Sequence, residues 1–114
     1  MLTTEKLRAY GADVDEGLKR CLNNETFYLT MVTKAMQDTS PYDRLAEALA
    51  AKDTDRAFEI AHGLKGVLGN LSLTPLYNPV AQTSDLLKAR TDMDYSDLLS
   101  EITARKDELV SLIG

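Results

Sequence analysis

Signals that start helices recur along the whole chain, and they constrain its fold more than any other feature. Asp13 followed by Glu16 three residues later is typical of a capping box at the N-terminus of a helix. Ser40 and Pro41 form an N-cap and first-turn pair, and Asp53 is placed to cap the helix that follows it. No glycine- or serine-rich linker, repeat or low-complexity tract separates these signals. The chain is therefore predicted to consist of helices joined by short connections.

Apolar residues between these signals recur with helical spacing. We expect helices over residues 3–10, 13–22, 25–38, 40–53, 53–73 and 95–113, and one more within 74–90. The broad apolar stripe of segment 25–38 is expected in the core, and it comprises Phe27, Tyr28, Met31, Val32, Ala35 and Met36. Helices of this kind bury their stripes by packing side by side. We predict an all-α fold, an antiparallel four-helix bundle with additional short N-terminal helices, as a single domain over residues 1–114.

The segment that follows Leu73 allows two starting points for its helix. Thr74 and Pro75 are a suitable start, but Pro79 then lies inside the helix and removes a hydrogen bond. Asn78 followed by Pro79 is an equally good start, and it leaves residues 74–78 as a tight turn. Both alternatives place residues 80–90 in a helix.

Charge and composition exclude several classes of function. The 114 residues carry a net charge of −5, which argues against nucleic acid and anionic membranes as partners. No apolar run approaches the ~20 residues of a membrane span, and no signal-peptide pattern opens the sequence. Cys21 is the only cysteine, so we expect a small buried apolar residue in a reducing, cytoplasmic setting. The oligomeric state cannot be read from the sequence.

The segment AHGLKGVLGNLSL, residues 61–73, combines the only histidine of the chain with three of its six glycines. With about 100° of rotation per residue, one face of this helix is apolar. That apolar arc contains Ala57, Ile60, Ala61, Leu64, Val67, Leu68 and Leu71. His62 lies nearly opposite the centre of the arc and is predicted to face solvent. Its neighbours on the outward side are Asp55, Glu59, Lys65, Gly66 and Gly69.

Glycines inside a helix are unfavourable and need a reason. Each interior glycine costs about 1 kcal/mol relative to alanine, so three cost roughly 2–3 kcal/mol of a total stability of ~5–15 kcal/mol. Gly66 and Gly69 do not face the apolar arc, so close packing between helices does not explain them. We infer that they clear side-chain bulk from around the imidazole of His62 and leave the ring open to a large partner.

The residues around His62 indicate one kind of chemistry. An exposed imidazole is mostly neutral at pH 7 and offers a nucleophilic ring nitrogen. No second histidine or cysteine pair supports a metal site, and no serine or cysteine is placed as a nucleophile for the ring to activate. The remaining chemistry is to take a phosphoryl group onto the ring and pass it on, with Lys65 one turn away to hold the phosphate charge. A lone surface histidine is usually only solvated, but that gives no reason for the lysine and the glycines beside it.

HGLKG followed by VLGNLSLTPL resembles the signature of histidine phosphotransfer (HPt) domains, and the likeness extends over essentially the whole chain. The resemblance implies a helical bundle in which His62 receives a phosphoryl group from a receiver-domain aspartate or a histidine kinase. It then donates this group to the receiver of a response regulator. Lys65 matches the family's phosphate-orienting lysine, and Gly66 matches its clearance glycine. Members often have a polar side chain on the following helix that hydrogen-bonds the imidazole, and the candidates here are Gln82 and Ser84.

The resemblance also implies the partners and the cofactors. The family's Mg²⁺ belongs to the receiver, so no metal or other cofactor is expected on this chain. The expected partners are the receiver domain of a response regulator and a hybrid sensor histidine kinase, with no nucleic acid and no membrane. No Gly-rich phosphate loop or nucleotide motif is present, so we expect a phosphoprotein carrier of a two-component phosphorelay and not an enzyme.

The sequence departs from the family pattern at several positions. Ser72 stands where many members have glycine, Val67 and Leu68 are bulkier than usual, and Pro79 is unexpected. We interpret these as adjustments of packing and docking surface. The alternative function is a non-phosphorylated helical adaptor that docks receiver domains or oligomerises through apolar surface. The retained histidine, lysine and glycine favour the carrier, because an adaptor has no chemical need of them.

Overall fold

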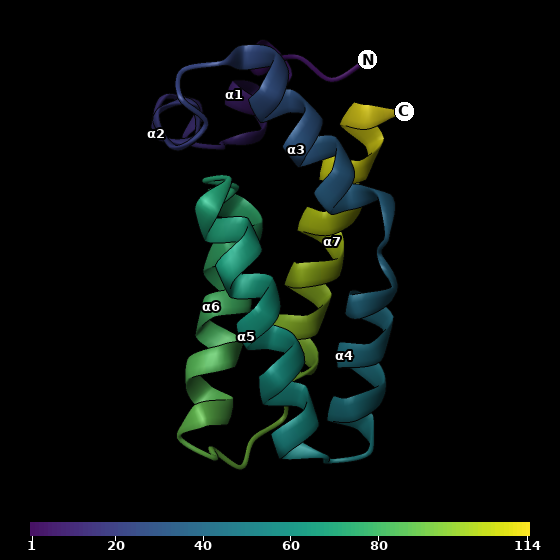
Figure 1. The fold of residues 1–114 in the computed structure, drawn as a ribbon. Coiled ribbons are helices and arrows are strands. Elements are labelled where there is room, and N and C mark those ends of the chain that lie inside the picture. Colours follow the sequence, from purple (N-terminus) through teal and green to yellow (C-terminus); the bar gives the residue numbers. More distant parts are fainter.

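The computed structural model describes all 114 residues, and it contains seven helices and no strand (Figure 1). The first three are α1 (Thr4–Tyr10), α2 (Val14–Arg20) and α3 (Glu25–Gln37). The other four are α4 (Ser40–Ala50), α5 (Thr54–Asn70), α6 (Thr74–Lys88) and α7 (Ser96–Ile113). Helices α4 to α7 run alternately down and up beside one another, and α1 and α2 lie over the end at which α5 meets α6 (Figure 1). The antiparallel four-helix bundle with additional N-terminal helices is confirmed.

Two helix starts are capped by the predicted aspartates, but Glu16 does not complete a capping box, because the N–H of Asp13 donates to the carbonyl of Ser72. The Asp13 carboxylate accepts a hydrogen bond from the backbone N–H of Glu16 at 3.3 Å. The Asp53 carboxylate accepts one from the backbone N–H of Arg56 at 3.2 Å. Each aspartate satisfies a backbone donor that has no partner inside its helix. These caps fix the first turns of α2 and α5.

Several helix boundaries differ from the prediction by one to three residues, and α4 and α5 end at Ala50 and Asn70, where we expected residues 53 and 73. Ser40 is the first residue of α4 and not its N-cap, and its backbone N–H donates to the Asp38 carboxylate at 2.9 Å. Helix α2 ends at Arg20, where we expected Leu22. Leu22 and Asn23 have φ angles of 60° and 56°, and this left-handed backbone cannot continue a right-handed helix.

Helix α6 begins at Thr74, so the first of the two alternatives is correct and Pro79 lies inside the helix. Because Pro79 has no N–H, it cannot bond to the carbonyl of Pro75 four residues earlier. Pro79 is buried, as are Leu76 one turn earlier and the adjacent Val80. Burial of this apolar ring offsets the missing hydrogen bond.

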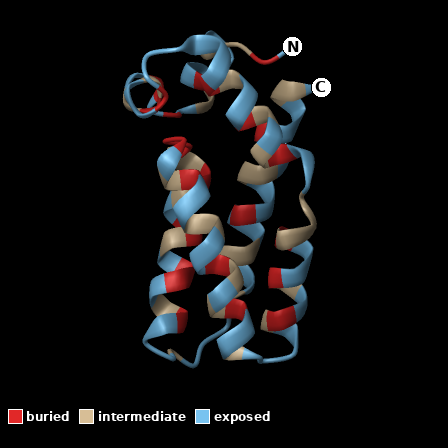
Figure 2. Cartoon of the chain, viewed as in Figure 1, coloured by how far each residue is buried: buried red, intermediate tan, exposed pale blue.

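The core follows the length of the bundle, with buried positions on the inward face of each helix (Figure 2). Cys21 is free and buried, as expected. The largest fully buried aliphatic side chains of the core are Leu7, Leu45, Leu68, Leu73, Leu76, Ile102 and Leu109. No helix is both long enough and apolar enough to cross a membrane.

Three residues that we expected in the core are exposed. Phe27, Met31 and Val67 are 46%, 36% and 47% exposed. Helix α3 lies at the edge of the bundle and is buried only along the row that begins with Tyr28. A residue one position earlier is rotated by about 100°, so Phe27 and Met31 turn away from the core. Val67 is turned away from buried Leu68 in the same manner.

The N-terminal helices are fixed to the end of α5 by backbone contacts. The hydroxyl of Tyr28 donates to the carbonyl of Leu71 at 2.8 Å, and the N–H of Asp13 donates to the carbonyl of Ser72 at 3.0 Å. Gly17 allows α2 to lie on the ring of Tyr28, because a Cβ at this position would be 2.6 Å from Tyr28 Cε1. Asp13 and Arg20, at the two ends of α2, therefore lie beside the end of α5.

Candidate functional site

His62 is exposed in the middle of α5, as the helical spacing predicts. Helix α5 packs against α4 and α6 through the buried residues Ala57, Ala61 and Leu68. The imidazole is on the opposite side of the helix from these contacts. The same phase that buries one face of α5 thus presents the ring nitrogen to solvent.

A polar hollow of about 530 Å³ lies beside the imidazole, and we call it the His62 groove. It is formed by α2, the exposed face of α5, the α5–α6 connection and the first turns of α6. Its lining consists of Asp13, Arg20, His62, Lys65, Gly66, Gly69, Asn70, Ser72, Thr74, Tyr77 and Asn78. Two basic side chains and one carboxylate line it, although the chain as a whole has a net charge of −5. The groove therefore suits an anionic group.

Phe58 stacks against the imidazole of His62. Its ring is stacked on that of His62, with centroids 5.4 Å apart and planes inclined by 25°. Phe58 lies one turn earlier on α5 and packs partly into the core. This contact restricts the rotation of a side chain that is otherwise open to solvent.

Lys65 lies one turn after His62 and forms an ion pair with α6. Its Nζ donates to Asp85 Oδ1 at 3.2 Å. The Lys65 side chain is 32% exposed and that of Asp85 is 68% exposed. The ammonium group of Lys65 is thus already partnered by a carboxylate.

The three glycines of α5 have different surroundings. A Cβ at Gly63 or at Gly66 would meet no atom within 4 Å, so both positions are open. Gly66 lines the His62 groove and Gly63 does not. A Cβ at Gly69 would lie 3.1 Å from Tyr77 Cε1 on α6. Our explanation of Gly69 as clearance alone was incomplete, because this glycine also lets α5 and α6 approach closely.

Three other residues that we expected at the site lie outside the groove. Glu59 and Gln82 are exposed but do not line it, and Ser84 is buried inside the bundle. None of the three forms a hydrogen bond to His62. The buried face of α6, which includes Val80, Thr83 and Leu87, also contains Ser84 and turns it inward. The expected hydrogen bond from Gln82 or Ser84 to the imidazole is therefore absent.

Sequence reasoning missed several residues that surround the imidazole. The contact of Phe58 with His62 could have been predicted, because residues four positions apart share one face of a helix. Asp85 could not be found because its contact with Lys65 depends on how α6 packs against α5, which the sequence alone does not give. Arg20 and Asn78 required the packing of separate helices around the end of α5. No local pattern in the sequence signals that juxtaposition.

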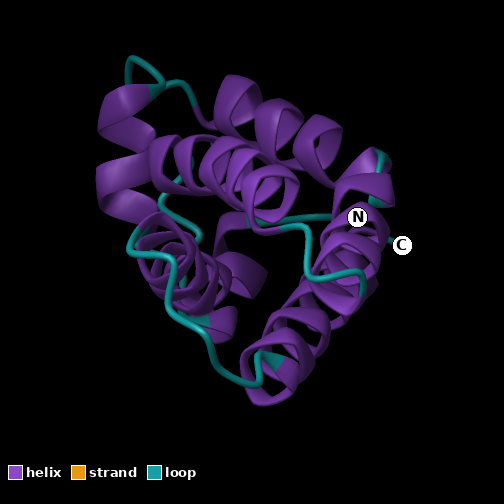
Figure 3. Ribbon diagram, turned by 90° about the horizontal axis from the view of Figure 1, so that it is seen from below, coloured by secondary structure: helices purple, strands orange, loops and turns teal.

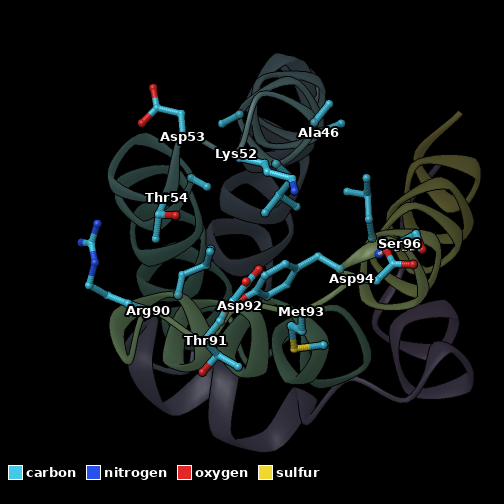
Figure 4. Close-up of a pocket in the computed structure, with 17 residues that line it drawn as sticks. Ala46, Lys52, Asp53, Thr54, Arg90, Thr91, Asp92, Met93, Asp94 and Ser96 are labelled. Atoms are coloured by element: carbon cyan, nitrogen blue, oxygen red, sulfur yellow. Dashed lines mark hydrogen bonds between the residues drawn. The ribbon is translucent and has the colours of Figure 1, made fainter.

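A larger hollow of about 770 Å³ lies at the other end of the bundle (Figure 4). The α4–α5 connection, with Lys52 and Asp53, forms one side of it, and the α6–α7 connection, with Asp92 and Met93, forms another (Figure 4). It shares no residue with the His62 groove. Seen from below, the ends of the helices and the loops that join them face the viewer at this end of the bundle (Figure 3). No three histidine, cysteine, aspartate or glutamate side chains of the chain are grouped so that they could hold a metal ion.

Comparison with known proteins assigns the fold to a family. The family model described as Hpt domain matches residues 29–112, which include α4 to α7 almost entirely, most of α3 and the whole His62 segment. Neither the curated proteins nor the solved structures gave a match. The match covers most of the chain and leaves α1, α2, the start of α3 and the last two residues outside it. The chain therefore belongs to the Hpt domain family.

Proposed function

We propose that this protein is a phosphoryl carrier of a phosphorelay, with His62 as the acceptor. The donor is the phosphorylated aspartate of a receiver domain or a histidine kinase, and the acceptor is the receiver of a response regulator. Membership of the Hpt family supports histidine phosphotransfer in general. The observation that carries the assignment to His62 is its exposed imidazole in a groove with two basic side chains.

The transfer needs one nucleophilic nitrogen and little else from this chain. The unprotonated ring nitrogen of His62 attacks the phosphorus of an aspartyl phosphate, so that an N–P bond forms and the P–O bond to the carboxyl group breaks. The aspartate leaves as a carboxylate, and the phosphorylated ring releases the proton of its other nitrogen. Donation to the next receiver reverses these steps. Positioning and charge supply most of the catalysis in phosphoryl transfer.

The chain's own residues have distinct parts in this proposal. Phe58 limits the orientations of the ring, and Lys65 pairs with the charge of the transferred group. Gly66 leaves open space one turn from the imidazole, into which a receiver's active-site loop can enter. The divalent cation and the acidic groups that bind it belong to the receiver on this proposal.

The test is to follow phosphoryl transfer in both directions. The protein is incubated with a phosphorylated receiver domain, and phosphohistidine is detected by intact mass spectrometry and by its acid lability. We expect labelling of the wild type and none of His62→Gln. Labelling of His62→Gln at the wild-type level assigns the acceptor to another residue. If several receivers bind the wild type without labelling it, the protein is an adaptor.

A further inference from the structure

The ion pair between Lys65 and Asp85 links the acceptor helix to its neighbour α6. The Lys65 Nζ and Asp85 Oδ1 atoms are 3.2 Å apart. Lys65 lines the His62 groove, and Asp85 does not. The Asp85 carboxylate on α6 therefore binds the Lys65 ammonium group from outside the His62 groove.

Phosphorylation of His62 introduces a competitor for this ammonium group. Residues three apart on a helix share one face, so Lys65 is within reach of a phosphoryl group on the ring. Such a group carries up to two negative charges, against one for the Asp85 carboxylate. Both anions compete for one flexible side chain, and the doubly charged one attracts it more strongly. The carboxylate and the phosphoryl group also repel each other.

We propose that Asp85 is a positioning residue that holds Lys65 in a resting ion pair and so lowers the stability of phosphorylated His62. This inference rests on the proposed function, because it concerns the phosphorylated state of the same site. Lys65 leaves Asp85 when the phosphoryl group arrives and returns when the group is donated. A carrier gains from this exchange, since a phosphoryl group held too firmly is not passed on.

A second ion pair provides a matched control. Arg90 Nη1 and Asp55 Oδ1 are 2.8 Å apart, and this pair joins the α6–α7 connection, just after α6, to the first turn of α5. Both side chains of this pair are strongly exposed, and neither lines the His62 groove. Removing Asp55 thus breaks another exposed ion pair of α5 without changing the partner of Lys65.

The experiment measures the equilibrium phosphorylation of His62 with phosphoramidate as the donor. The N–P bond of phosphoramidate breaks, ammonia leaves, and a new N–P bond forms to the ring, so added ammonia sets the position of the equilibrium. The ratio of phosphorylated to free protein is read by intact mass spectrometry for the wild type, Asp85→Asn and Asp55→Asn. The same substitution at Asp85 is repeated in a Lys65→Gln background. Circular dichroism checks that each variant is folded.

We expect Asp85→Asn to raise this ratio about two- to fivefold, the range of an exposed ion pair. Asp55→Asn leaves it unchanged, and Asp85→Asn has a much smaller effect once Lys65 is absent. An unchanged or lowered ratio in Asp85→Asn overturns the inference, as does an equal rise in Asp55→Asn or an undiminished effect without Lys65. A wild type that takes up no phosphoryl group on His62, from phosphoramidate or from receivers, overturns the proposed function itself.

Discussion

The ring of Phe58 stacks on the imidazole of His62, with centroids 5.4 Å apart and planes inclined by 25°. The two residues are one turn apart on α5, and Phe58 packs partly into the core while His62 is exposed. The partly buried ring of Phe58 thus supports an exposed imidazole that is otherwise free to rotate. Stacking leaves the imidazole fewer orientations in the free protein. Less conformational entropy is therefore lost when a partner binds at its ring nitrogen.

Replacing Phe58 by leucine is expected to slow phosphorylation of His62 by phosphoramidate about two- to tenfold. The aromatic pair is worth ~0.5–1.5 kcal/mol beyond its burial, and leucine retains most of the apolar packing. Initial rates from intact mass spectrometry measure the effect, and urea denaturation checks the fold. Phe27→Leu is the control, because Phe27 is an exposed aromatic residue on α3 outside the groove. Equal rates for Phe58→Leu and the wild type would show that the stack does not orient the ring.

Gly63 and Gly66 are open positions at which the stability cost of a glycine inside a helix can be measured directly. A Cβ meets no atom within 4 Å at either position. Gly63→Ala and Gly66→Ala are each expected to stabilise the fold by about 1 kcal/mol, because alanine restricts the unfolded chain and favours a helix. Urea denaturation of both variants measures this gain. A loss of stability in either variant contradicts the open surroundings of that glycine.

A larger side chain at the same two positions tests the groove itself. Gly66→Leu is expected to slow transfer from a phosphorylated receiver by about tenfold or more, because the side chain occupies the space in which the partner aligns with the imidazole. Gly63→Leu is the matched control, since Gly63 is equally open but lies outside the groove. Transfer rates are compared at equal receiver concentration. Similar rates for the two leucine variants would remove the clearance role of Gly66.

Periodicity predicted the parts of the site that depend on one helix. The phase of α5 is set by Ala57, Ala61 and Leu68, and it places His62 on the exposed side whatever the neighbouring helices do. Val67 was wrongly placed in the core because it lies at the edge of the apolar arc. Whether a side chain at this edge is buried depends on how the neighbouring helix covers it. The apolar pattern of a single helix does not predict this.

Contacts between helices were beyond the reach of the sequence. The expectation of a hydrogen bond from Ser84 failed because this residue lies on the face of α6 that is buried in the bundle. The packing of α6 against α5 brings Asp85 to Lys65. Arg20 reaches the groove only because α2 is fixed to the end of α5 by contacts between residues distant in sequence. One sequence does not specify such pairings, since they depend on tertiary packing.

Ser72 occupies a backbone conformation that glycine adopts more readily. Its φ angle is 54°, just after the C-cap Leu71 of α5, where left-handed backbone commonly ends a helix. Ser72→Gly is expected to stabilise the fold by about 0.5–1 kcal/mol, because a residue with a Cβ is strained there. Lys52→Gly, with a φ angle of 56° after α4, should show a similar gain away from the groove. Denaturant unfolding compares the two, and a loss of stability in Ser72→Gly alone would show that its buried side chain outweighs the strain.

Stability at alkaline pH should depend on two buried tyrosines. Burial raises the pKa of Tyr28 to about 12 and that of Tyr42 to about 12, above the ~10 of an unfolded chain. The unfolded state therefore loses its phenolic protons first, so this part of the stability is complete below about pH 10 and is lost as the pH rises towards 12. Tyr42→Phe removes one such proton and no side-chain hydrogen bond, so its unfolding free energy should fall less between pH 9 and pH 11 than that of the wild type.

Tyr28→Phe gives a different result at neutral pH, because its hydroxyl donates to the carbonyl of Leu71 at 2.8 Å. Loss of this bond is expected to cost about 1 kcal/mol at pH 7, where Tyr42→Phe is close to neutral. Tyr28→Phe should then share the weaker alkaline dependence of Tyr42→Phe, because it also lacks a phenol that ionises on unfolding. Urea denaturation at pH 7, 9 and 11 measures both effects. If both variants follow the wild-type pH dependence, proton release by these tyrosines does not cause the alkaline loss of stability.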